Sequence, residues 1–379
     1  MTSSTATGVS GSLVPQHRAT VFNTEHPLVL ESGISLTPIE VEYETHGTLN
    51  ARGDNAILVC HALTGSAHVA GYASEDPGSI GWWDPAVGPG RPLDTDRYFV
   101  VCSNFLGGCY GTTGPTSINP VTGRLYGIEF PAVTVRDLVT VQRALLGQLG
   151  VSRLVTVIGG SLGGMQVLEW GAMFPEIVAS LIPIATATQH SPWCIGLNEV
   201  ARQAIVNDPD WMNGTYPADK QPERGLSLAR QIAMISYRSD LSFMDRFHRD
   251  TASPPTGDTL KDHLGVCYQV ESYLRYQGTK LVRRFDANTY LSITRTMDGH
   301  DLARGRGSLQ EVLGGIDMPA LCVGIDSDIL YPAYEQQTIA DGLPRGYYFQ
   351  LHSPHGHDAF LIEHEQLGAA VSAFLRDLV

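Results

Sequence analysis

Basic residues, long apolar runs and a secretory leader are all scarce or missing in this chain of 379 residues. It has 25 Lys and Arg against 39 Asp and Glu, a net charge of −14, and no cationic cluster. We therefore expect no nucleic-acid partner, because phosphates would be repelled. No apolar run is long enough for a bilayer span, so no membrane partner is expected. The opening residues have neither a cationic nor an apolar segment, and we expect no signal peptide.

Paired cysteines and a clear metal-binding pattern are also missing. The cysteines are scattered without a C-x-x-C pair, which is typical of a reduced chain and predicts a cytoplasmic location. His352, His355, His357 and His364 lie close together in sequence, and a metal site is one interpretation. No carboxylate or thiolate at ligand spacing accompanies them, and H-E-x-x-H is absent. We expect no metal.

Apolar sequence is abundant, at 43% of the residues, and can bury a large core. Short apolar runs bounded by turn residues predict buried strands, and amphipathic segments between them predict helices. The strands are expected at residues 56–60, 98–102, 154–158, 177–184 and 320–325, and the helices at 135–149 and 162–174. This order predicts an α/β fold, with a mostly parallel central sheet and helices on both faces. Two earlier segments, PLVLESG and PIEVEYETHG, alternate with period two and predict antiparallel strands.

The strand and helix alternation stops after Ala185 and resumes near Ser308. The interval is rich in Arg, Tyr, Met and Gln at helical spacing, which indicates a helical insertion. The resulting prediction is a flexible tail over residues 1–17, a core domain over residues 18–186 and 306–379, and a helical lid over residues 187–305.

The sharpest local motif is G-x-S-x-G, from Gly159 to Gly163, between a predicted strand and a predicted helix. A serine in such a tight turn adopts a strained backbone, and the flanking glycines remove side chains that would clash. Ser161 would project its hydroxyl above the sheet edge, where the N–H of Leu162 could stabilise an oxyanion. The alternative is a glycine-rich turn without chemistry.

A serine nucleophile needs a base, and the base needs a carboxylate to fix its tautomer. The acidic turn after the strand at 320–325 offers two carboxylates. Asp328 is the candidate, because Asp326 lies earlier in the turn and its side chain is expected to close it.

The base is expected after the next apolar run, at residues 347–351. His357 follows a glycine and opens the final predicted helix, whereas His352 and His355 are expected at the surface or in turns. The order Ser161, Asp328, His357 is the chain order of an α/β-hydrolase triad. Since each of the three follows a predicted parallel strand, the sequence predicts an α/β-hydrolase fold with that triad.

A second oxyanion donor is expected in the loop after the strand at 56–60, where the N–H of Leu63 is the natural partner of Leu162. His61 in the same loop is interpreted as a hydrogen-bonded turn residue. The glycine-rich segment 104–115 has neither P-loop nor dinucleotide spacing, and we expect a shaped loop beside the site.

With these residues in place, the chain closely resembles the homoserine O-acetyltransferase family, acyltransferases of the α/β-hydrolase fold in methionine biosynthesis. The resemblance rests on segments that span most of the chain after the tail: HALTGSAH from His61, NFLGGCYGTTGP from Asn104, GGSLGGMQ from Gly159, LARQIAMISYRS from Leu228, DSDILYP from Asp326 and GHDAFL from Gly356. It implies that Ser161 is acylated, that Asp328 and His357 complete the triad, and that the residues holding the amino-acid acceptor are Arg230, Tyr237 and Asp358.

The resemblance further implies ping-pong transfer of an acetyl group from acetyl-CoA to the γ-hydroxyl of L-homoserine. Acetyl-CoA is then a substrate, no cofactor is permanently bound, and the chain is expected to be a homodimer paired through the lid helices. The chemistry fits, because Arg230 could grip the carboxylate of homoserine and Asp358 its ammonium. Arg230 and Tyr237 lie on one helix-like stretch, however, and could serve packing instead.

Other activities fit the same triad. A homoserine O-succinyltransferase, a serine O-acyltransferase and a serine esterase or thioesterase all remain open, as does a scaffold that has lost its chemistry.

Overall fold

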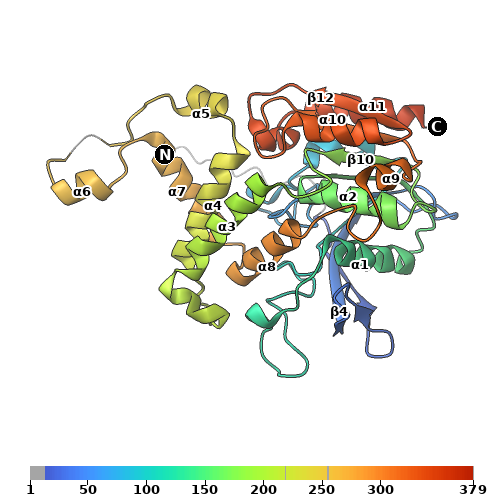
Figure 1. Cartoon of the computed structure of the whole chain (residues 1–379), viewed down its shortest axis with the longest axis horizontal. Coiled ribbons are helices and arrows are strands. Elements are labelled where there is room, and N and C mark those ends of the chain that lie inside the picture. Colours follow the sequence, from blue (N-terminus) through green and yellow to red (C-terminus); the bar gives the residue numbers. More distant parts are fainter. Residues whose placement is uncertain (1–12, 218, 254–255, 379) are drawn as a thin grey trace, which may run out of the picture.

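The computed structural model describes residues 13–217, 219–253 and 256–378. Within them an eight-stranded sheet has the order β1-β4-β8-β5-β9-β10-β11-β12 (Figure 1). These strands are β1 (His17–Phe22), β4 (Ile39–His46), β5 (Ala56–Cys60), β8 (Phe99–Ser103), β9 (Leu154–Gly160), β10 (Leu181–Ile184), β11 (Ala320–Ile325) and β12 (Gly346–Leu351). Strands β8, β5 and β9 to β12 pair in parallel, and β4 is antiparallel to β1 and β8. The expected mostly parallel sheet is confirmed.

Helices cover both faces of the sheet, as predicted. Because successive side chains of a strand point to opposite faces, Leu58 belongs to one apolar cluster and Ile57 to another. The helices of the first cluster are α1 (Val135–Gln148), α2 (Leu162–Met173), α9 (Leu309–Gly314) and α10 (Ala333–Gly342). The second face is covered by α11 (His364–Asp377). Two small ribbons complete the strands: β2 (Leu28–Val29) with β3 (Ser35–Leu36), and β6 (Val87–Gly88) with β7 (Leu93–Asp94).

The chain between β10 and α9 is helical and extends to one side of the sheet (Figure 1). Its helices are α3 (Pro192–Val206), α4 (Glu223–Tyr237), α5 (Asp240–Phe247), α6 (Thr259–Leu264), α7 (Gln269–Val282) and α8 (Ala287–Asp298), with one 3₁₀ segment, η4 (Pro209–Gly214). One apolar cluster joins Leu226 of α4 and Tyr290 of α8 to Leu63 and Met165. These helices, called the lid below, therefore lie over the turn that contains Ser161.

Most strand limits follow the apolar runs. Strands β5 and β11 coincide with the predicted ranges, and β8 is displaced by one residue. The predicted strand 177–184 is too long, because only Leu181–Ile184 forms β10. Residues 175–177 form a turn, and Val178 makes a single bridge to Leu154. This stretch therefore contacts β9 at one point without continuing the strand.

The N-terminal end is described from residue 13 onward. Strand β1 begins at His17, the last residue of the predicted tail, and residues 1–12 lie outside the described residues. The division into tail, core and lid therefore stays a prediction. None of the helices that the structure describes is long and apolar enough to cross a bilayer.

Candidate active site

Ser161 occupies the turn between β9 and α2 in a strained conformation, with φ 59° and ψ −124°. A side chain at Gly159 or at Gly163 would collide with the carbonyl oxygen of Cys60, which explains both glycines of the motif. The backbone is held because the Ser161 N–H donates to the Ile184 carbonyl at 3.0 Å. Such strain, in a residue type that ordinarily avoids positive φ, favours a functional turn over a plain connection.

The acid and base candidates meet beside this turn. His357 Nδ1 lies 2.7 Å from Asp328 Oδ2, and both residues are buried. The other carboxylate oxygen of Asp328 accepts hydrogen bonds from the N–H groups of Leu330 at 2.8 Å and Tyr331 at 3.0 Å. The carboxylate is thus fixed from both sides, in the arrangement that orients a catalytic imidazole.

The competing residues lie elsewhere in the same loops. Asp326 accepts from the Ser353 N–H at 3.0 Å and contacts His352 Nδ1 at 2.9 Å, so it joins its turn to the loop after β12. The prediction that the Asp326 side chain closes its own turn is wrong, because Asp328 accepts from the N–H groups of that turn. His352 is exposed, and His355 faces the Ser242 hydroxyl at 3.5 Å. In the described part of the chain, no group of three or more His, Cys, Asp or Glu side chains could hold a metal.

One sequence prediction about His357 is wrong. The residue does not open the final helix: it lies in a separate 3₁₀ segment, η5 (Gly356–Leu361), and α11 begins only at His364. Gly356 has φ 67°, and a side chain there would collide with the backbone of Ser239 after α4. Gly356 packs against the lid in a turn conformation, so the chain changes direction before α11 begins.

The environment of His357 favours its charged form. Burial opposes the imidazolium, but the charge and hydrogen bond of Asp328, with the charge of Asp358, raise the pKa of His357 above its ordinary value of 6.5. A base with this pKa accepts a proton readily and holds it while a tetrahedral intermediate exists.

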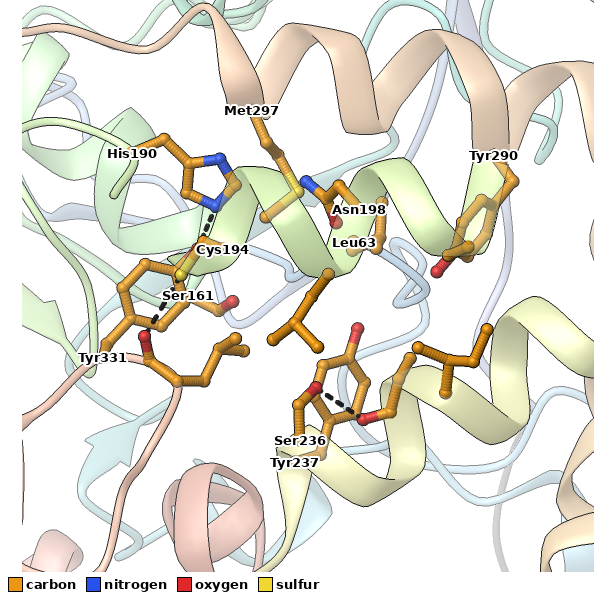
Figure 2. Close-up of a pocket in the computed structure, with 15 residues that line it drawn as sticks. Leu63, Ser161, His190, Cys194, Asn198, Ser236, Tyr237, Tyr290, Met297 and Tyr331 are labelled. Carbon is orange, nitrogen blue, oxygen red and sulfur yellow. Dashed lines mark hydrogen bonds between the residues drawn. The ribbon is translucent and has the colours of Figure 1, made fainter. Parts of the chain in front are cut away.

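Among the described residues, Ser161 and His357 make no direct hydrogen bond, and His357 reaches the Ser161 cavity only through the tyrosines of its wall. Ser161 opens into a narrow cavity whose walls include Tyr237 and Tyr331 (Figure 2). The His357 ring contacts both tyrosines, with centroid distances of 5.8 and 5.2 Å. Catalytic hydrogen bonds often form fully only with substrate bound, so this arrangement is compatible with a triad.

The two predicted oxyanion donors are the backbone N–H groups of Leu63 and Leu162. Leu162 is the first residue of α2, so its N–H has no partner within the helix. Among the described residues, neither its N–H nor that of Leu63 donates a hydrogen bond, and the Leu63 side chain lines the cavity. His61 stacks on Phe105 at 4.5 Å and its Nδ1 contacts the Ala62 carbonyl at 2.9 Å. Burial lowers the pKa of His61 to about 4, which keeps this turn residue neutral.

The predicted acceptor residues gather on the lid side of His357. Arg230 of α4 lies over the Tyr237 ring at 5.4 Å and has no ion-pair partner among the residues described. Asp358 follows His357, and burial raises the pKa of Asp358 although the charges of Arg238, Arg230 and His357 oppose this. The charge of Arg230 therefore acts on Asp358, the residue next to the imidazole, while Tyr237 forms part of the cavity wall.

Sequence reasoning missed Arg238, whose Nε lies 3.2 Å from Asp358 Oδ2. It also missed Tyr331, which contacts both Asp328 and His357. Both residues lie inside segments that carry the family resemblance, and that was the available signal. Their contacts join distant parts of the chain, so residue type and spacing could not predict which partners they would contact.

Comparison with known proteins agrees with this geometry. Residues 55–364 match the model of the alpha/beta hydrolase fold family. A homoserine O-acetyltransferase of Carboxydothermus hydrogenoformans is 52% identical over 352 residues, 92% of each chain. One of Symbiobacterium thermophilum is 53% identical over 374 residues, 97% of this chain and 96% of that one.

Solved structures give the same fold with two kinds of activity. The homoserine O-acetyltransferase of Bacillus anthracis superposes with a TM-score of 0.88 at 28% identity, covering 96% of this chain and 98% of the other. Esterase E22 superposes with a TM-score of 0.86 at 29% identity, covering 96% of this chain and 100% of the other. The sequence identity to the two homoserine O-acetyltransferases, 52% and 53%, is far higher than the 28% and 29% to the two solved structures. The chain therefore belongs to the homoserine O-acetyltransferase family of α/β-hydrolase-fold acyltransferases.

Proposed function

We propose that this enzyme transfers an acetyl group from acetyl-CoA to the γ-hydroxyl of L-homoserine through an acyl-serine, as a step of methionine biosynthesis. The observation that carries the proposal is the unpaired Arg230 guanidinium beside Asp358 and the Asp328–His357 pair. An acceptor with a carboxylate and an ammonium needs one cation and one anion at a fixed distance from the acylated serine.

In the first half-reaction, His357 Nε2 takes the proton of the Ser161 hydroxyl, and Oγ attacks the thioester carbonyl. The N–H groups of Leu63 and Leu162 stabilise the resulting oxyanion, and Asp328 stabilises the imidazolium. Collapse of the intermediate breaks the carbon–sulfur bond, and the departing thiolate takes the proton from His357. The products of this step are free coenzyme A and acetyl-Ser161.

In the second half-reaction, Arg230 binds the carboxylate of homoserine and Asp358 its ammonium. His357 removes the proton from the γ-hydroxyl, whose oxygen attacks the acyl carbon. Collapse returns the proton to Ser161 Oγ and releases O-acetyl-L-homoserine. The lid limits the access of water to the acyl-serine, because its helices α3, α4 and α8 form most of the cavity wall.

The cavity also bears on the acyl donor. The residues lining it include no Lys, Arg, Asp or Glu among those that the structure describes. A succinyl carboxylate in this space would lose its hydration without gaining a cation, whereas an acetyl methyl group needs no partner. This supports acetyl-CoA over succinyl-CoA, and the donor itself is a substrate and not a bound cofactor.

The test follows free thiol after mixing enzyme with acetyl-CoA, with and without homoserine. We expect at most one equivalent of thiol without acceptor and continuous release with it. Esterase E22 makes hydrolysis the competing activity, and continuous thiol release at full rate without homoserine would establish it. Succinyl-CoA and serine, offered in the same assay, test donor and acceptor choice.

Arg230→Ala separates the two half-reactions in the same assay. We expect acylation of Ser161 to keep its rate, while the KM for homoserine rises, because the carboxylate loses a charge-assisted partner worth about 1.5–3 kcal/mol. Arg345→Ala, at an exposed arginine beyond α10, is the control and should change neither step. Poor acylation by Arg230→Ala would show that the residue does not belong to the acceptor site.

We further propose that two copies pair through the lid helices. The lid exposes large apolar side chains to water, among them Val200 of α3 and Leu228 and Ile235 of α4. Exposed apolar side chains that lie together are typical of a protein–protein interface. Val200 and Leu228 border one groove between α3 and α4. Light scattering should give twice the 41.0 kDa of the chain, and Leu228→Glu should shift it to one copy; a wild-type monomer would disprove the pairing.

A cytoplasmic location is part of the proposal, since all six cysteines are free. Recovery of the protein in the envelope fraction of lysed cells would contradict it.

A further inference from the structure

A chain of buried polar contacts leads away from the cavity. The Tyr331 hydroxyl lies 3.1 Å from His190 Nε2, a contact drawn in Figure 2. His190 Nδ1 lies 3.3 Å from Asp298 Oδ1. The same carboxylate receives Asn198 Nδ2 at 2.8 Å and an Arg202 nitrogen at 2.7 Å. Tyr331 and His190 are nearly inaccessible to water, and neither has a role in the mechanism above.

The chain of contacts joins the lid to the core. Asn198 and Arg202 belong to α3 and Asp298 is the last residue of α8, so both lid helices meet at one carboxylate. His190 lies between β10 and α3, and Tyr331 lies in the loop after β11. In addition to their apolar packing, two helices of the lid are thus connected to one loop of the catalytic core by hydrogen bonds and ion pairs.

At its other end, Tyr331 contacts two members of the proposed triad. Its N–H donates to Asp328 Oδ1 at 3.0 Å, and its ring lies 5.2 Å from the His357 ring. Any rotation of the Tyr331 side chain therefore changes the space available to the imidazole. A displacement of about 1 Å at a reacting group can cost on the order of a hundredfold in rate.

The carboxylate of Asp298 determines which groups donate and which accept along this chain of contacts. Burial opposes ionisation of Asp298, but hydrogen bonds from His190 and Asn198 and the charge of Arg202 lower its pKa below the usual range. A carboxylate facing Nδ1 holds a proton on that nitrogen, as in carboxylate–histidine pairs elsewhere. With that proton on Nδ1, Nε2 is the acceptor for the hydrogen of the Tyr331 hydroxyl, which fixes the orientation of the ring.

We infer that Tyr331 is a positioning residue for the acyl transfer, held by His190 and Asp298 so that the packing of α3 and α8 on the core sets the orientation of the His357 imidazole. The inference rests on the proposed function, because it acts through the proposed base. The Tyr331 hydroxyl then affects the rate of serine acylation without binding either substrate.

The test compares variants that differ in one hydrogen bond. Tyr331→Phe removes only the hydroxyl. His190→Met removes the acceptor, whereas His190→Gln keeps a side chain of nearly the same size and restores an acceptor oxygen. Tyr216→Phe is the control, since its hydroxyl makes a 2.6 Å hydrogen bond to Asp286 between lid segments away from the triad. The measurement is the single-turnover rate of Ser161 acylation by acetyl-CoA, with the melting temperature recorded for each variant.

We expect Tyr331→Phe and His190→Met each to slow acylation by on the order of tenfold or more, with the KM for homoserine unchanged. His190→Gln should recover most of the rate, and the Tyr331→Phe/His190→Met double variant should be no slower than either single variant, because both break one chain of contacts. Tyr216→Phe should lower the melting temperature only.

Wild-type acylation rates in folded Tyr331→Phe and His190→Met would overturn the inference and leave the proposed function standing. Equal rates for His190→Gln and His190→Met, or fully additive losses in the double variant, would also overturn it. Failure of the wild-type enzyme to acylate Ser161 at all would instead remove the proposed function, and the inference with it.

Discussion

Ser161→Ala should lose acyl transfer by about 10⁶-fold, to the level left by binding alone, because removing the nucleophile of a triad abolishes the covalent route. Mixed with acetyl-CoA, the wild-type protein should gain one acetyl group by intact-mass spectrometry, and the variant none. Fluorophosphonate labelling should be lost in parallel. The effect is the largest expected for any single substitution here.

The loss should occur in a folded protein. The turn is held by backbone contacts and by the Thr186 hydroxyl, which donates to the Ser161 carbonyl at 2.9 Å, and none of these needs the serine side chain. Ser236→Ala is a matched control: this serine also lines the cavity, but its hydroxyl donates to the Ala233 carbonyl of its own helix. It should acylate normally, whereas an acetyl group on Ser161→Ala would place the nucleophile elsewhere.

The core of the fold was predictable because a two-sided buried strand needs a continuous apolar run, and β5 and β11 are such runs with turn residues at both ends. The same logic overextended β10, since residues 178–180 follow a turn and contact β9 only through an isolated bridge and hydrogen bonds, without continuing the strand. Strand β1, HRATVF, was missed because only one side of it has a neighbouring strand and polar residues alternate along it.

The site was predictable where the chemistry dictates residue type and chain order. A serine between glycines, a carboxylate after β11 and a histidine after β12 meet these demands, and the structure brings Asp328 and His357 into contact. Contacts that depend on three-dimensional packing were not predictable. Arg238 reaches Asp358 only because Gly356 lets the η5 segment approach the end of α4, and no spacing in the sequence encodes that meeting.

Asp328→Asn should reduce kcat by about 10⁴-fold while leaving the loop folded. The amide oxygen can still accept from the Leu330 and Tyr331 N–H groups. The amide nitrogen, however, would face His357 Nδ1 and donate to it, which places the imidazole proton on Nε2. The base would then present a proton to Ser161 when it should accept one.

The residual activity should also change its pH dependence. His357 acts as a base only when neutral, so activity falls as the pH drops through its pKa, which the wild-type surroundings raise above 6.5. The charge of Asp328 contributes to that rise, and burial alone lowers the pKa. The acid limb of kcat/KM for acetyl-CoA should therefore move to lower pH in Asp328→Asn. The control is Asp326→Asn, in the same turn but bonded to exposed His352, which should keep both the wild-type rate and the wild-type acid limb of the pH profile. An equal loss of rate in this control would show that Asp328 does not set the protonation state of His357. An acid limb that does not move in Asp328→Asn would show the same.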